Sequence, residues 1–142
     1  MIKFNYLIGN KNKIIKATFY AKGDESLQIE YTNLKVQKII CDTKQLKKKV
    51  GLEIGKKVIL RLNQLKATEN FNMYLTQIRL GNPHPLSGNF YSCYAISITA
   101  NYRLIVEPME TKLDMESLRN CKKIDVKGVV DYHDGKNTWI IP

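Results

Sequence analysis

The chain has 142 residues, 44% of them hydrophobic, and a formal net charge of +10 at pH 7, which is typical of one domain with a real core. No run reaches the roughly 18 to 20 apolar residues of a membrane helix, and no secretory signal is recognisable, so we expect a cytoplasmic protein without a membrane partner. Three cysteines without a Cys-x-x-Cys pair argue against a disulfide framework and a zinc site.

The first 26 residues are predicted to form an extra β-hairpin. Residues 2–8 and 13–21 are rich in Ile, Phe, Tyr and Thr, and they flank a Gly-Asn-Lys-Asn turn at residues 9–12. Glycine and asparagine supply the positive φ angles that a tight turn needs. Residues 27–31 are predicted to form one more short strand.

Two helices are predicted over residues 42–66. Asp42 is placed to cap the first helix, and Gly51 is a natural stop for it. Gly55 weakens the second helix by about 1 kcal/mol relative to alanine. Residues 68–70 are predicted to cap a short third helical turn. The second helix carries one apolar stripe at helical spacing, made of Ile54, Val58, Leu62 and Leu65.

Basic side chains gather in this helical segment. Residues 35–66 contain ten basic and two acidic residues, a net +8 of the total charge. Such a region attracts polyanions with an affinity that falls as salt rises, although an ordinary solvated lysine-rich helix face has the same sequence pattern. The candidate RNA-contacting residues here are Lys47, Lys48, Lys56, Lys57 and Arg61.

The second half of the chain is predicted to be mainly strands. The periodicity changes to two, which predicts strands at residues 77–80, 91–99, 102–106 and 124–132, with a helical turn near residues 115–118. In the third of these strands, Arg103, Ile105 and Glu107 share the face opposite to Tyr102, Leu104 and Val106. Helices followed by an antiparallel meander indicate an α+β fold.

Both histidines lie beside groups that could cleave RNA without a metal. A ribose 2′-OH can attack the adjacent phosphorus when a base removes its proton, a cation stabilises the transition state and an acid protonates the leaving oxygen. Histidine suits the proton transfers, and arginine suits the charged phosphorus centre. His84 stands between two prolines, and His133 ends a strand. Each also has a plainer interpretation, as a rigid loop residue or as part of a turn, and Arg103 could be an ordinary surface residue.

From about residue 27 to residue 133, about three quarters of its length, the chain resembles the RelE/HigB-type toxins of type II toxin–antitoxin pairs. A helical hairpin over residues 52–70 also matches. The resemblance is carried by His-Pro-Leu-x-Gly-Asn at residues 84–89, Tyr-Ala-Ile at 94–96, Tyr-Arg-Leu-Ile at 102–105 and Val-Asp-Tyr-His at 130–133.

The resemblance implies an α+β, microbial RNase-like fold in which an N-terminal helical hairpin packs on an antiparallel sheet. One domain would span residues 1–142, with residues 1–26 as an added hairpin, residues 27–133 as the core and residues 134–142 as an extension. The implied activity is that of a metal-independent endoribonuclease that cuts translated mRNA on the 70S ribosome. The implied partner is a HigA-like helix-turn-helix antitoxin, with no small-molecule cofactor.

By analogy, the catalytic residues would be His84, Arg103, Asp131, Tyr132 and His133. Tyr94 and Tyr102 would contact RNA bases, because aromatic faces stack on splayed nucleotides. Ser87 and Phe90 stand where the family has basic residues. The alternative is therefore a catalytically degenerate RelE-fold module that binds the ribosome, RNA or an antitoxin without cleavage.

Overall fold

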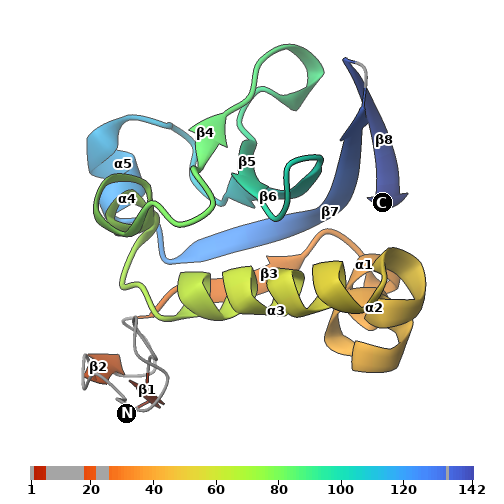
Figure 1. Ribbon diagram of the computed structural model, residues 1–142. Helices are drawn as coiled ribbons and strands as arrows, with labels where there is room; N and C mark the ends of the chain where they lie inside the picture. The colour runs from red at the N-terminus through yellow and green to blue at the C-terminus, as the bar shows by residue number, and fades with distance from the viewer. Residues whose placement is uncertain (1, 6–17, 22–25, 134) are drawn as a thin grey trace.

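A computed structural model describes residues 2–5, 18–21, 26–133 and 135–142. It confirms the α+β class and shows helices gathered beside one mixed sheet (Figure 1). The helical elements are α1 (Leu34–Cys41), α2 (Thr43–Val50), α3 (Leu52–Lys66), α4 (Phe71–Met73), the π-helical turn η1 (Tyr74–Ile78), the 3-10 turn η2 (Gly88–Phe90) and α5 (Met115–Arg119). The strands are β1 (Ile2–Asn5), β2 (Thr18–Ala21), β3 (Gln28–Tyr31), β4 (His84–Pro85), β5 (Tyr94–Ser97), β6 (Tyr102–Pro108), β7 (Lys123–His133) and β8 (Lys136–Ile141).

The main sheet is built around the long strand β7. Its order is β3-β7-β6-β5-β4, and β8 also pairs with β7, beyond the segment that β3 occupies. All pairs are antiparallel, as expected, except that β3 runs parallel to β7. Strands β1 and β2 pair antiparallel in a separate two-stranded sheet, while the predicted turn at residues 9–12 lies outside the described residues.

Local signals explain the helical layer. The carboxylate of Asp42 accepts hydrogen bonds from the backbone N–H groups of Lys44 and Gln45, which caps α2 as predicted. Gly51 ends α2 with φ +89, a backbone conformation that favours glycine. Helix α1 was not predicted, although Asn33 caps it through the N–H of Val36. None of the described helices is long and apolar enough to cross a membrane.

One prediction in this region is wrong. Residues 77–80 do not form a strand, because the chain continues from α4 into the π-helical turn η1. Arg79 then ends the turn in a left-handed conformation with φ +54. The hydroxyl of Tyr74 donates to the carbonyl of Leu80, which fixes the exit from the turn. The loop that follows this turn therefore leads to β4 at the edge of the sheet.

The sheet separates two apolar clusters. The face toward the helices buries the main core, in which Leu104, Val106 and Val129 are fully buried. The other face carries a smaller cluster made of Cys93, Ala95, Ile105 and Val130, with Leu86, Phe90 and Trp139 packed against it. Successive residues of a strand point to opposite faces, so β6 and β7 each contribute to both clusters.

Candidate functional site

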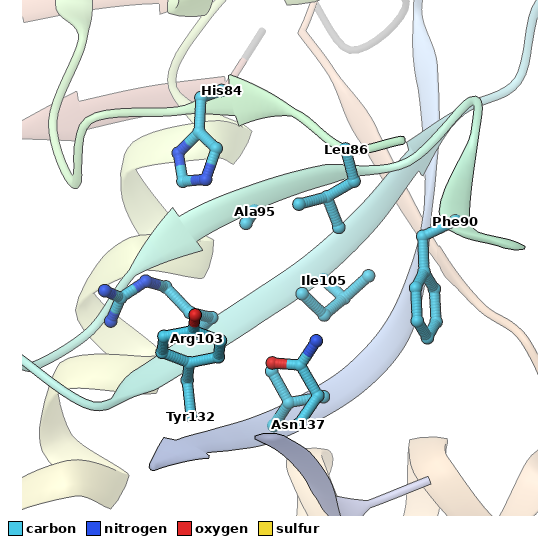
Figure 2. A pocket seen from close by; sticks show the side chains of 9 residues that line it. His84, Leu86, Phe90, Ala95, Arg103, Ile105, Tyr132 and Asn137 are labelled. Atoms are coloured by element: carbon cyan, nitrogen blue, oxygen red, sulfur yellow. The ribbon is translucent and has the colours of Figure 1, made fainter. Parts of the chain in front are cut away.

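A pocket of about 340 Å³ lies on the sheet face with the smaller cluster. Figure 2 shows His84, Arg103 and Tyr132 at one end, Phe90 at the other, and apolar side chains between them. The complete lining is His84, Leu86, Phe90, Ala95, Arg103, Ile105, Val130, Tyr132 and Asn137. We call this hollow the first pocket. It brings together three of the five predicted catalytic residues, from β4, β6 and β7.

The loop that carries His84 is held against the sheet by a close backbone approach. The N–H of Ser97 donates to the carbonyl of Gly81 at 2.6 Å. A Cβ atom on residue 81 would lie 2.6 Å from Cγ2 of Ile96, and the φ of Gly81 is +78. Only glycine fits this position without displacement of its neighbours. His84 and Pro85 then pair with β5, opposite Ala95 and Tyr94, so the histidine has a fixed place at the pocket edge.

A single contact orients the His84 ring. Its Nδ1 lies 3.1 Å from the carbonyl oxygen of Asn82. A carbonyl can only accept a hydrogen bond, so Nδ1 carries the proton when this bond forms. In the neutral ring, Nε2 then presents a lone pair. The exposed side chain of His84 is thus oriented to accept a proton through Nε2.

Arg103 is anchored through one of its terminal nitrogens. Nη1 donates to the carbonyl oxygens of Thr99 at 2.8 Å, Ala100 at 2.9 Å and Tyr102 at 3.1 Å. Within the described residues, no hydrogen bond involves Nη2 or Nε. A guanidinium held in this way keeps one edge of its planar fork for an anion, such as the oxygens of a phosphate.

Tyr132 and Asn137 complete the polar part of the lining. Tyr132 is 44% exposed, and it is paired across the β7–β8 ladder with Asn137. Sequence reasoning did not identify Asn137, because its segment lies beyond the resemblance and only the pairing of β8 with β7 brings it to the pocket. Leu86, Phe90 and Ile105 were also not predicted as lining residues. Phe90 was named only as a position where the family has a basic residue.

Asp131 and His133 lie apart from the first pocket. Strand alternation places them on the face of β7 opposite to Val130 and Tyr132. Nδ1 of His133 pairs with Oδ1 of Asp131, and Nε2 of His133 lies 3.0 Å from the amide nitrogen of Asn101. The structure thus separates these two predicted catalytic residues from His84 and Arg103. Together with Asn101 they tie the end of β7 to the turn before β6.

The predicted base-stacking tyrosines belong to the core instead. Tyr94 is 7% exposed, its ring meets Phe71 edge-on at 5.1 Å, and burial raises its pKa. Tyr102 is half-buried against the main core. Tyr94 and Tyr102 were predicted to contact RNA bases, but neither ring lines the first pocket. The ring of Tyr94 is enclosed by protein packing, which leaves no face for a base.

The predicted basic residues lie in the helical layer, on the other side of the sheet from the first pocket. Lys47, Lys48, Lys56 and Lys57 are exposed. Arg61 differs, because its Nε donates to the carbonyl of Ser97 at 2.9 Å and its Nη1 donates to Gln64 at 3.0 Å. Arg61 therefore holds α3 against the end of β5. In the part of the chain that the structure describes, no group of three or more His, Cys, Asp and Glu residues is placed to hold a metal.

Comparisons with known proteins find similarity only to solved structures. No protein-family profile and no curated protein matches it. A YoeB/ParE toxin from Agrobacterium tumefaciens aligns with a TM-score of 0.47 at 15% identity over 75% of this chain and 99% of that one. A YoeB dimer from Staphylococcus aureus aligns with a TM-score of 0.45 at 18% identity, over 76% of this chain and 98% of that one. A YoeB–YefM complex from Staphylococcus aureus aligns with a TM-score of 0.41 at 18% identity, over 75% of this chain and 97% of that one.

Proposed function

We propose that the chain is a toxin of a type II toxin–antitoxin pair and that the first pocket cleaves RNA without a metal. The observation that carries the proposal is that His84 and Arg103 line the same pocket, although 19 positions separate them in the sequence. A base and an anchored cation around one hollow are the minimum that 2′-OH attack on a phosphodiester needs. The substrate that the sequence resemblance implies is translated mRNA on the ribosome.

The first step of the proposed reaction uses the free nitrogen of His84. Nε2 takes the proton of the ribose 2′-OH while the 2′ oxygen bonds to the adjacent phosphorus. The carbonyl of Asn82 holds the Nδ1–H and so supports the imidazolium that forms. This arrangement commits one ring nitrogen to orientation and the other to proton transfer.

Arg103 and Tyr132 act in the second part of the reaction, the departure of the 5′ oxygen. The open edge of the Arg103 guanidinium stabilises the charge on the equatorial phosphate oxygens. The bond from phosphorus to the 5′ oxygen breaks, and the hydroxyl of Tyr132 donates its proton to that oxygen. The products are a 2′,3′-cyclic phosphate and a free 5′-OH end. Water then returns a proton from the His84 imidazolium to the tyrosinate.

The test compares Arg103→Ala with a matched control, Arg119→Ala. Arg119 is an exposed arginine on α5 and does not line the first pocket. Loss of a preorganised donor to a developing charge costs about 10²- to 10³-fold in rate, so Arg103→Ala should abolish growth arrest on expression. Primer extension on ribosome-bound mRNA should detect cuts with the wild-type protein and Arg119→Ala only. Cuts at the wild-type rate with folded Arg103→Ala would overturn the catalytic proposal.

A second candidate function has one observation in its favour. Among the described residues that line the first pocket, Arg103 is the single permanent cation, and Phe90 contributes a hydrophobic wall. A pocket with so little positive charge could hold RNA without cleaving it. Growth arrest that persists in a His84→Ala, Arg103→Ala double variant, without mRNA cuts, would favour this binding-only module.

The proposed contact with the ribosome uses a different surface from the first pocket. The sequence resemblance implies an antitoxin and the ribosome as partners. The exposed lysines of α2 and α3 form a cationic layer opposite to the first pocket, and such a layer can hold ribosomal RNA while the pocket holds the message.

A further inference from the structure

A second pocket of about 450 Å³ adjoins the first, and Phe90 lines both. We call it the flanking pocket. Ser92, Glu107 and Lys127 form its polar side, and Trp139 with Phe90 forms its aromatic side. Glu107 shares a strand face with Arg103 and Ile105, so the two pockets open on the same side of the sheet. Neither the sequence resemblance nor the proposed reaction assigns a role to this pocket.

The polar side of the flanking pocket is a closed network around one carboxylate. The Ser92 hydroxyl donates to Oε2 of Glu107, and Nζ of Lys127 lies 3.2 Å from Oε1. The same Nζ lies 2.9 Å from Oδ2 of Asp125 and 3.5 Å from Oγ1 of Thr32. Burial raises the pKa of Glu107, but the hydrogen bonds from Ser92 and Lys127 outweigh it and hold the pKa below its ordinary value. Glu107 is therefore ionised at neutral pH.

The charge balance of the network selects the ligand. One lysine faces two carboxylates, a net charge of −1, and the contacts of Lys127 with Asp125, Glu107 and Thr32 engage its donors. A phosphate would meet net repulsion in this pocket. A ligand that presents N–H donors would instead find the remaining lone pairs of the Glu107 carboxylate. Adenine, cytosine and guanine carry an exocyclic amino group with two N–H donors, whereas uracil carries no amino group and offers only its ring N3–H.

The aromatic side supplies a surface for a flat ligand. The rings of Phe90 and Trp139 lie 5.8 Å apart at an angle of 52°, and both are only partly buried. A base that leaves the stack of a single strand can cover such rings, and stacking of this kind tolerates any base. The stack would then provide affinity, and the carboxylate would provide selection.

We propose that the flanking pocket binds one nucleobase of the RNA strand whose phosphate occupies the first pocket, and that Glu107 selects bases with an amino group. This inference rests on the proposed function, because the strand reaches the flanking pocket past Phe90 from the first pocket. A cationic protein segment is the other ligand that the net −1 network of Glu107, Asp125 and Lys127 could attract. Because Phe90 lines both pockets, a strand held in the first pocket passes beside the flanking pocket, and this favours the RNA base.

The experiment measures binding of seven-residue 2′-O-methyl RNAs by fluorescence anisotropy. These probes lack the attacking hydroxyl, so they stay intact. The set comprises all-uridine RNA and variants with one adenosine, cytidine or guanosine at each position. At one fixed position, an amino-bearing base should bind about tenfold more tightly than uridine. Glu107→Gln should remove this preference.

Two further variants keep the test independent of folding. Glu116→Gln removes one exposed carboxylate on α5 and should leave the preference intact. Ser92→Gly removes the hydroxyl that holds Glu107, while glycine readily adopts the φ of +83 at this position. It should weaken the preference in a protein that remains folded.

Three outcomes would overturn the inference. Equal affinity for all probes would show that the flanking pocket does not select bases. Absence of binding would show that it does not bind a base. In both cases, cleavage of ribosome-bound mRNA by the same protein would leave the proposed function intact. Displacement of the probe by a tri-arginine peptide from the wild type, but not from Glu107→Gln, would assign the pocket to a cationic protein segment.

Discussion

His84 and His133 are a matched pair in which one histidine lines the first pocket and the other does not. The His84 ring is oriented by one backbone carbonyl and presents Nε2 to the pocket. The His133 ring is engaged at both nitrogens, by Asp131 and by Asn101. A ring with both nitrogens engaged has no free lone pair for proton transfer. The two histidines should therefore differ in their importance for catalysis.

The comparison of His84→Ala with His133→Ala tests this difference. General acid–base catalysis contributes about 10²- to 10⁴-fold, so His84→Ala should slow mRNA cleavage by at least about 100-fold. His133→Ala removes a surface contact and should leave the cleavage rate near that of the wild type. Cleavage rates on ribosome-bound mRNA, with circular dichroism as the folding control, decide the matter. An equal loss in both variants would mean that His133 shares the chemistry.

The Glu107 network gives a prediction about stability and pH. The pKa of Glu107 is below its ordinary value of 4.5 in the folded chain, so its ionised form stabilises the fold. This contribution is fully present above pH 4.5 and is lost as the pH falls through the folded-state pKa. Glu107→Gln should therefore be less stable than the wild type at pH 7, and this difference, measured by urea unfolding, should be smaller at pH 3. A difference that is the same at both pH values would contradict the pKa shift.

At the scale of elements, a glycine that weakens its own helix lies at the contact between α2 and α3. Gly55 is buried in α3, where a Cβ atom would lie 3.5 Å from Cγ of Lys47 and 3.6 Å from Cγ of Leu46. Both distances are ordinary van der Waals contacts. The packing thus tolerates an alanine, and the glycine only adds conformational freedom to the unfolded chain.

Gly55→Ala should consequently stabilise the protein. The expected gain in the free energy of unfolding is about 1 kcal/mol, from helix propensity and reduced chain entropy. Gly128 offers the contrasting control, because its Cβ atom would lie 1.7 Å from the carbonyl oxygen of Ile141 and its φ is +145. Thermal unfolding should show a higher midpoint for Gly55→Ala and a lower one for Gly128→Ala. A destabilised Gly55→Ala would mean that α2 and α3 pack more closely than the structure describes.

The sequence predicted helices and their ends correctly where the signal lies in neighbouring residues. Asp42 and Gly51 mark the ends of α2, and the stripe through Val58 and Leu62 marks α3. Residues 77–80 were misassigned because their short apolar pattern fits a π-helical turn as well as a strand. The parallel pairing of β3 with β7 joins segments about 95 positions apart, and nothing in either segment alone encodes that contact.

At the scale of the whole molecule, the sheet divides the protein into a basic helical side and a side with two pockets. Alternation in the strands predicted that Arg103, Ile105 and Glu107 share a face, and the structure confirms it. Alternation alone could not tell which face meets the helices, because both faces of β5 and β6 include apolar residues. Asn137 could not be predicted at all, because it reaches the first pocket through a pairing outside the resemblance.

The most direct test of the central claim is a double-mutant cycle on the cleavage of ribosome-bound mRNA. If His84 and Arg103 act on one phosphate, each alanine variant should lose most of the rate, and the double variant should lose little more than the worse single one. Single-turnover rates from primer extension, with Arg119→Ala as the control, provide the measurement. Wild-type rates in either single variant, or full multiplication of the two losses in the double variant, would contradict a shared site.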